Sequence, residues 1–213
     1  MLEPQFEGVY GKYTITLADQ MEVKKYRVAV FICGLSFSLG LAQWMIFGPN
    51  LAWIWLISMS IALGLALQWI HIYIDFLHKA LQTLWVIGSL GIFLLLYNFG
   101  AQGILANIAS KPILGLIISP FFASLTGLGF KEFFCFRRPE AIGLTLILPI
   151  SLIAHLMGIF DLKVIMVLLS ISAILLLTLS IRKFGLDAAL DIGDKSIFEF
   201  LKNKKHSAST SGI

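Results

Sequence analysis

The residues with the most obvious capacity for chemistry lie between positions 68 and 82. They are spaced three, four, three and four residues apart: Gln68, His71, Asp75, His78 and Gln82. If this stretch is helical, the spacing places all five on one face, and no glycine or proline interrupts it. The pattern therefore predicts a continuous polar stripe at the end of an apolar segment.

Imidazole and carboxylate groups on one stripe suggest a ligand site. His71, Asp75 and His78 would offer three ligands to a divalent metal, or one histidine would ligate a haem or a chlorophyll. The alternative is a wetted face on which histidine and aspartate hydrogen-bond to each other. The spacing differs from the HExxH zinc signature, and three residues on one stripe do not define a site alone.

A second polar group lies in the segment 130–139. Glu132 and Cys135 are three residues apart and would share a helical face, where they would add an oxygen and a sulfur ligand to the histidine stripe. The alternative is a basic, aromatic anchor, with Arg137 and Arg138 at lipid phosphates. We expect the two groups to lie on the same side of the membrane but apart from each other.

His155 is the only ionisable residue within a long apolar segment. Such residues are costly in a bilayer and suggest a function by default. It is a candidate pigment or haem ligand, or a residue that handles protons. The alternative is a histidine whose polar atoms are satisfied by packing or by the headgroup region.

Several activities lose support because their motifs are missing. The chain has no P-loop, no GxSxG elbow and no closely spaced histidine boxes. No acidic residue lies in the middle of an apolar segment, which weakens a proton-coupled transporter. We assign no catalytic residue and expect a protein that is not an enzyme.

The composition indicates that membrane helices position these residues. The chain is 58% hydrophobic and 13% charged, with a mean hydropathy of +0.89, so lipid must solvate much of its surface. An all-α bundle of about six membrane helices is predicted. The spans are 28–47, 51–70, 84–99, 112–130, 141–160 and 164–181.

The distribution of basic residues predicts the orientation. Fourteen of the sixteen lysines and arginines lie in the two terminal segments and in the second and fourth connections. The positive-inside rule places these segments, and both termini, on the cytoplasmic or stromal side. The net charge of +4 therefore sets orientation, and no nucleic-acid partner is expected.

Segments outside the spans are expected to be short. Thr16 and Asp19 resemble a capping box that starts an amphipathic helix leading into the first span, and no signal peptide is evident. The chain divides into an N-terminal arm (1–27), the membrane domain (28–181), a segment docked on the cytoplasmic face (182–202) and a disordered tail (203–213). Ile192, Ile197 and Phe198 are the residues expected to dock.

Four segments together carry a family resemblance. They are 11–16 with Asp19, the stretches 71–73 and 77–82, the segment 131–136 (KEFFCF), and the tail 191–200 (DIGDKSIFEF). The set resembles an uncharacterised integral membrane family of cyanobacteria and plant plastids, over residues from about 8 to 202. The resemblance implies a photosynthetic lineage and a thylakoid or cytoplasmic membrane. It carries no established activity.

Three functions remain open at this stage. The first is a non-enzymatic accessory, assembly or pigment-binding protein of a photosynthetic membrane, with the bilayer and membrane complexes as partners. The second is a small-molecule or ion transporter, with Gln68, His71 and His155 beside the path. The third is a membrane enzyme with a metal or haem held by the polar residues above.

Overall fold

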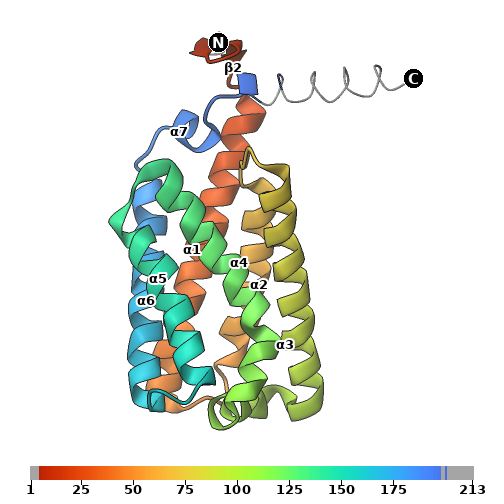
Figure 1. Cartoon of the computed structure of the whole chain (residues 1–213), viewed down its shortest axis with the longest axis vertical. Coiled ribbons are helices and arrows are strands. Elements are labelled where there is room, and N and C mark those ends of the chain that lie inside the picture. The colour runs from red at the N-terminus through yellow and green to blue at the C-terminus, as the bar shows by residue number, and fades with distance from the viewer. Residues whose placement is uncertain (1–4, 198–199, 201–213) are drawn as a thin grey trace, which may run out of the picture.

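The fold is a bundle of helices with a small cap at one end (Figure 1). The computed structural model describes residues 5–197 and residue 200. The bundle helices are α1 (Leu17–Phe47), α2 (Trp53–Trp69), α3 (Asp75–Ser110), α4 (Gly115–Phe136), α5 (Pro139–Leu156) and α6 (Leu162–Lys183). The remaining elements are β1 (Gln5–Gly8), β2 (Gly11–Thr14), the short 3₁₀ helix η1 (Pro112–Leu114) and α7 (Ala188–Ile192).

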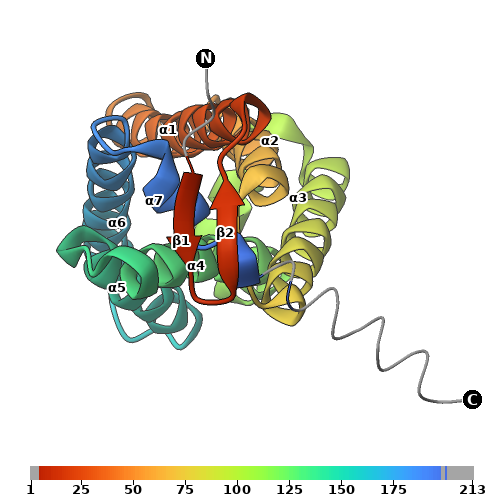
Figure 2. The ribbon, with the colours of Figure 1, turned by 90° about the horizontal axis from the view of Figure 1, so that it is seen from above.

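The six bundle helices form a closed ring. Each packs against its neighbours in sequence, and α1 packs against α6 to close it, as the view from above shows (Figure 2). Successive helices are antiparallel. The segments 5–16 and 184–197 and the connections 70–74 and 137–138 therefore lie at one end, the terminal end. The connections 48–52 and 157–161 lie at the other, the distal end.

The helices have the length and composition of membrane spans. In the part of the chain that the structure describes, five segments are long and apolar enough to cross a bilayer, and α2 is a shorter apolar helix of 17 residues. Because α2 returns the chain from the distal to the terminal end, α1 and α3 can both cross only if α2 crosses too. A 17-residue helix is at the lower limit for doing so. The prediction of an all-α, multi-pass membrane protein is confirmed.

The first helix begins earlier than the predicted span. Asp19 N donates to Thr16 Oγ1 at 3.2 Å, and Thr16 N donates to Asp19 Oδ2 at 2.7 Å, so both halves of the capping box are present. The amphipathic helix and the first span are consequently one uninterrupted helix from Leu17 to Phe47.

The predicted polar stripe is not continuous. The helix stops at Trp69, residues 70–74 are not helical, and α3 starts at Asp75. The chain has to reverse here because α2 and α3 are antiparallel neighbours, and the β-branched Ile70 and Ile74 both adopt extended backbone angles. The spacing of three and four residues does not produce one face here, because Gln68 belongs to α2, His71 to the connection, and the other three residues to α3.

The third helix runs beyond its predicted end at residue 99. Gly100 has φ 69° and ψ 166°, which interrupts the helix and turns the segment 101–110 away from the axis of α3. This segment and η1 form the distal connection between α3 and α4.

The cap at the terminal end joins the two ends of the chain. Strands β1 and β2 form an antiparallel hairpin in which Phe6 pairs with Tyr13, and this hairpin was not predicted. Beneath it, Ile15, Val23 and Ile192 form a small apolar cluster. Ile192 is 1% exposed, whereas the neighbouring tail residue Phe198 and the segment 203–213 lie outside the described residues.

Two glycines allow α3 and α4 to approach closely. A Cβ added at Gly88 would overlap the backbone of Phe121, and one at Gly91 would overlap the carbonyl oxygen of Ile117. We expect Gly88→Ala to cost about 1–3 kcal/mol of unfolding free energy, because the backbone of α4 must move to admit the methyl group.

The matched control is Gly103→Ala on the same helix, where the nearest atom to the new Cβ is 3.5 Å away. Thermal unfolding in mild detergent should show a lower midpoint for Gly88→Ala than for Gly103→Ala. Equal midpoints would contradict this account of the α3–α4 contact.

Candidate functional site

The polar residues singled out in the sequence do not assemble around one point. Among residues 5–197 and 200, no group of three or more His, Cys, Asp and Glu side chains is placed to hold a metal ion. His71 Nε2 lies 3.7 Å from Glu22 Oε2, across the reversal between α2 and α3. Burial lowers the pKa of His71, and the Glu22 carboxylate acts in the opposite direction.

His78 and Gln82 complete the end of α2. His78 Nε2 is 2.6 Å from the carbonyl oxygen of Leu67, and Gln82 Nε2 donates to the same oxygen at 3.3 Å. A helix leaves its last carbonyls without partners, so these side chains satisfy one of them. Asp75 stands in the first turn of α3, where a carboxylate interacts favourably with the helix dipole.

Glu132 and Cys135 face different surroundings although they are three residues apart. Glu132 is 1% exposed and points into the bundle, whereas Cys135 is exposed. Neither approaches a histidine in any contact that the structure records. The proposed set of nitrogen, oxygen and sulfur ligands is therefore spread over three locations.

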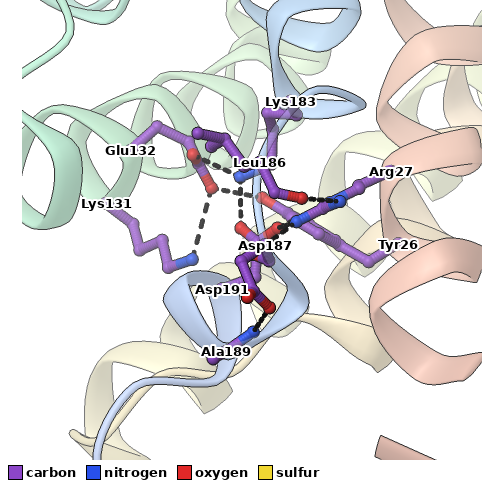
Figure 3. A network of polar contacts seen from close by, with 9 residues as sticks. All are labelled: Tyr26, Arg27, Lys131, Glu132, Lys183, Leu186, Asp187, Ala189 and Asp191. Atoms are coloured by element: carbon purple, nitrogen blue, oxygen red, sulfur yellow. Dashed lines mark hydrogen bonds and ion pairs between the residues drawn. The ribbon is translucent and has the colours of Figure 1, made fainter. Parts of the chain in front are cut away.

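Glu132 instead belongs to a buried charge network at the terminal end (Figure 3). Its carboxylate accepts from the Tyr26 hydroxyl at 2.6 Å and lies 2.6 Å from Lys183 Nζ and 3.2 Å from Lys131 Nζ. Lys183 Nζ also donates to Asp191 Oδ1 at 2.5 Å. The network joins α1, α4, α6 and α7.

Arg27 ties α7 into this network. Its guanidinium pairs with Asp191 Oδ2 at 2.7 Å and donates to the carbonyl oxygens of Leu186 and Asp187 at 2.9 and 3.0 Å. These bonds use the planar donor fork of arginine, which a lysine cannot replace. They fix the short connection between α6 and α7 against the first helix.

The network is almost completely withdrawn from solvent. Its five charged side chains are between 1% and 8% exposed. They comprise three cations, Arg27, Lys131 and Lys183, and two carboxylates, Glu132 and Asp191. The rings of Tyr26 and Phe136 lie within 5.5 Å of both lysine ammonium groups, and aromatic faces attract cations when water is excluded.

Further polar contacts hold the cap over the network. Asp194 Oδ2 accepts from Val9 N at 2.7 Å, Ser196 Oγ accepts from Tyr10 N at 3.0 Å, and Lys195 Nζ donates to Asp19 Oδ2 at 2.7 Å. The hairpin and the tail therefore hold each other in place, and the terminal end of the ring is closed.

The distal half of the ring contains a cavity instead. The centre of a water-sized sphere can move through about 120 Å³ of it, and all six bundle helices contribute to its wall. The wall is largely apolar and aromatic, with Phe37, Trp44, Trp55, Phe122 and Met166 among its members. An apolar, aromatic wall of this character is typical of sites for small apolar ligands.

His155 belongs to the wall of this cavity. Its Nε2 atom is 3.1 Å from the carbonyl oxygen of Ile108, in the segment that follows Gly100. Of the histidines singled out in the sequence, it alone lines the cavity. The structure therefore separates a closed, charged terminal end from a hollow, apolar distal end.

Sequence reasoning missed the charge network. Arg27, Lys131 and Lys183 all stand just outside the predicted spans and were counted only as orientation signals. Their position is the signal that could have found the network. Each of the three cations lies within two residues of the end of a predicted span, at the same end of the bundle as Glu132 and Asp191. A charge that close to the bilayer needs a partner.

The network predicts unequal effects for two carboxylate substitutions. Asp191→Asn should lower the unfolding free energy by about 3–5 kcal/mol, because it leaves buried Arg27 and Lys183 short of a charged partner. Glu22→Gln is the matched control, since the Glu22 side chain is 50% exposed and faces only His71, and it should cost under about 1 kcal/mol.

Unfolding by titration of SDS into mild detergent micelles would measure both variants. If Asp191→Asn were no more sensitive to SDS than Glu22→Gln, the network would not be what holds the terminal end together.

Comparison with known proteins places the chain in a family. The family described as "Uncharacterized integral membrane protein (DUF2301)" matches residues 65–200, more than half of the chain. The match includes α3 to α7 and therefore Glu132, Lys183, Asp191 and His155. Searches of curated proteins and of solved structures found no match. The chain belongs to this family of uncharacterised integral membrane proteins, as its sequence motifs predicted.

Proposed function

We propose that this chain is a non-enzymatic accessory protein that binds an apolar, membrane-soluble molecule in its distal cavity. One observation carries the proposal: all six bundle helices enclose an apolar space at one end of the ring. Close-packed interiors leave few voids larger than a water molecule. The centre of a water-sized sphere can move through about 120 Å³ of this space, which is several times what one water molecule needs, and the apolar wall suits a small apolar molecule.

The polar groups support binding rather than catalysis. Glu132 and Asp191 are neutralised by buried cations at the terminal end, away from the cavity. The cavity wall itself carries no acidic or basic side chain apart from the imidazole of His155. Acid–base catalysis and metal chemistry both need several such groups in one place.

The cavity wall also argues against passage of ions. Selective pathways are built from rings of carbonyl oxygens or charged side chains. Besides two indole N–H groups, the polar side chains of this wall are two serines and one histidine. Gln68 and His71, which the transporter hypothesis placed beside the path, lie at the opposite end of α2. The cavity therefore favours an apolar ligand.

A photosynthetic membrane is the proposed location. The support is the resemblance of four sequence segments to proteins of cyanobacteria and plant plastids. A pigment is an apolar molecule of such a membrane, and the apolar cavity wall suits that class of ligand. A pigment is accordingly the first ligand class to test, and assembly of a pigment-containing complex is the proposed context.

We also propose that the terminal end faces the cytoplasm or stroma. The support is the concentration of lysine and arginine in the segments that lie there. Reporter fusions after Lys111 and after Arg138 should then report opposite sides of the membrane, with Arg138 inside. Fusions that report the same side would overturn the orientation and the crossing by α4.

Purification in mild detergent tests the ligand proposal. The protein should retain an apolar compound that is detected in its absorption spectrum or by mass spectrometry of a solvent extract. Gly115→Leu should lose this compound, because Gly115 lines the cavity and a Cβ there meets no atom within 4 Å, so the new side chain has room to enter.

Gly103→Leu provides the control, since Gly103 does not line the cavity. It should retain the compound. Wild-type protein that carries no compound, or equal retention by the two variants, would argue that the cavity is not a ligand site. An extract that contains a colourless lipid would exclude a pigment and keep the cavity as the site.

A further inference from the structure

Several polar groups in the cavity wall already have hydrogen-bond partners within the protein. Ser119 Oγ donates to the carbonyl oxygen of Gly115 at 2.7 Å, and Trp55 Nε1 donates to Gln43 Oε1 at 2.5 Å. Ser36 Oγ is paired with Ser58 Oγ at 2.8 Å. The remaining indole, Trp44, lies in the last turn of α1, and its N–H group has no hydrogen-bond partner among the described residues.

His155 is constrained in the same way. Its Nε2 atom faces the carbonyl oxygen of Ile108 at 3.1 Å, and a carbonyl can only accept, so Nε2 carries the proton. In the neutral imidazole the second nitrogen, Nδ1, is then an acceptor. Nδ1 makes no hydrogen bond to any residue in the described part of the chain, and the ring is only half-buried.

Two residues of the wall therefore offer lone pairs to a ligand. Ser119 and His155 both donate to backbone carbonyls, and each keeps an acceptor site for a ligand. A ligand that brings only acceptors, such as a ketone, an ether or an ester, finds no complementary donor at these two residues. A ligand with a hydroxyl group does find an acceptor.

We propose that the distal cavity selects apolar alcohols: membrane-soluble molecules with a hydrocarbon body and one hydroxyl group. The hydroxyl donates to Nδ1 of His155, and the hydrocarbon body packs against Phe37, Phe122 and Met166. This inference rests on the proposed function and names the ligand class of the same cavity.

The size of the preference follows from the value of one hydrogen bond. A hydrogen bond between neutral groups changes binding about two- to tenfold, and loss of a partner for a buried polar atom adds to that. A site that hydrogen-bonds to a ligand hydroxyl discriminates strongly against an analogue that lacks the hydroxyl. The discrimination against an analogue that lacks one methylene group is weaker. We expect a preference of at least threefold for the alcohol.

A matched pair of fluorescent probes tests the proposal. All-trans-retinol and its methyl ether share the same hydrocarbon body and oxygen atom, and only the alcohol has a proton to donate. Binding to the purified protein in lipid nanodiscs is measured by energy transfer from tryptophan, since Trp44 and Trp55 line the cavity. Wild-type protein should bind retinol at least threefold more tightly than the ether.

Variants assign the preference to His155. His155→Phe keeps an aromatic ring and lacks the acceptor, so it should bind both probes equally. His155→Gln keeps an acceptor and should retain part of the preference.

The outcomes separate the two proposals. Equal binding of both probes by wild-type protein overturns the selection of alcohols and leaves the apolar ligand site standing. Binding of neither probe overturns both. The wild-type comparison needs no variant, so a folding defect in His155→Phe, visible by size-exclusion chromatography, does not affect it.

Discussion

The burial of five charges at the terminal end is the constraint on which the rest of the structure depends. Moving an ion out of water costs several kcal/mol, and the cost is offset only when every charge keeps well-placed partners. Here the partners come from four helices: Arg27 on α1, Glu132 on α4, Lys183 on α6 and Asp191 on α7. A shift of any of these helices along its axis would leave a charge unpaired, so the network fixes their relative heights as well as their neighbours.

This constraint explains why the two ends of the ring differ. In a six-membered ring the distance from the centre to each helix axis is roughly the spacing between neighbours, about 8–10 Å, which leaves space inside. At the terminal end α7 and the hairpin lie over that space (Figure 2), and the charged side chains of the network are buried there. In the middle, large side chains such as Leu63, Phe121 and Leu125 fill it and are fully buried.

Sequence patterns predicted the elements well and the site poorly, for physical reasons. Apolar length finds membrane helices because every backbone polar group must be satisfied within the bilayer, and the Thr16–Asp19 box located the start of α1. The prediction of a polar stripe was wrong because spacing along a chain implies a shared face only within one helix. The reversal at residues 70–74 contains no glycine or proline, so nothing in the sequence indicates that the helix ends there. Sequence patterns could not predict the charge network, because Arg27 and Asp191 are 164 residues apart and come into contact only when the ring closes.

At the distal end the side chains that face the centre of the ring are too small to fill the space between the helices. Several residues that face the centre there are small, among them Gly40, Ala52, Ala109 and Gly115. An unfilled apolar cavity destabilises a fold in proportion to its volume, and no charge network compensates at this end. A molecule that fills the space removes that cost and stabilises the folded protein through its own binding. The charged end can therefore keep its shape without a ligand, whereas the hollow end gains stability from one, and the same gain is what would make the cavity a binding site.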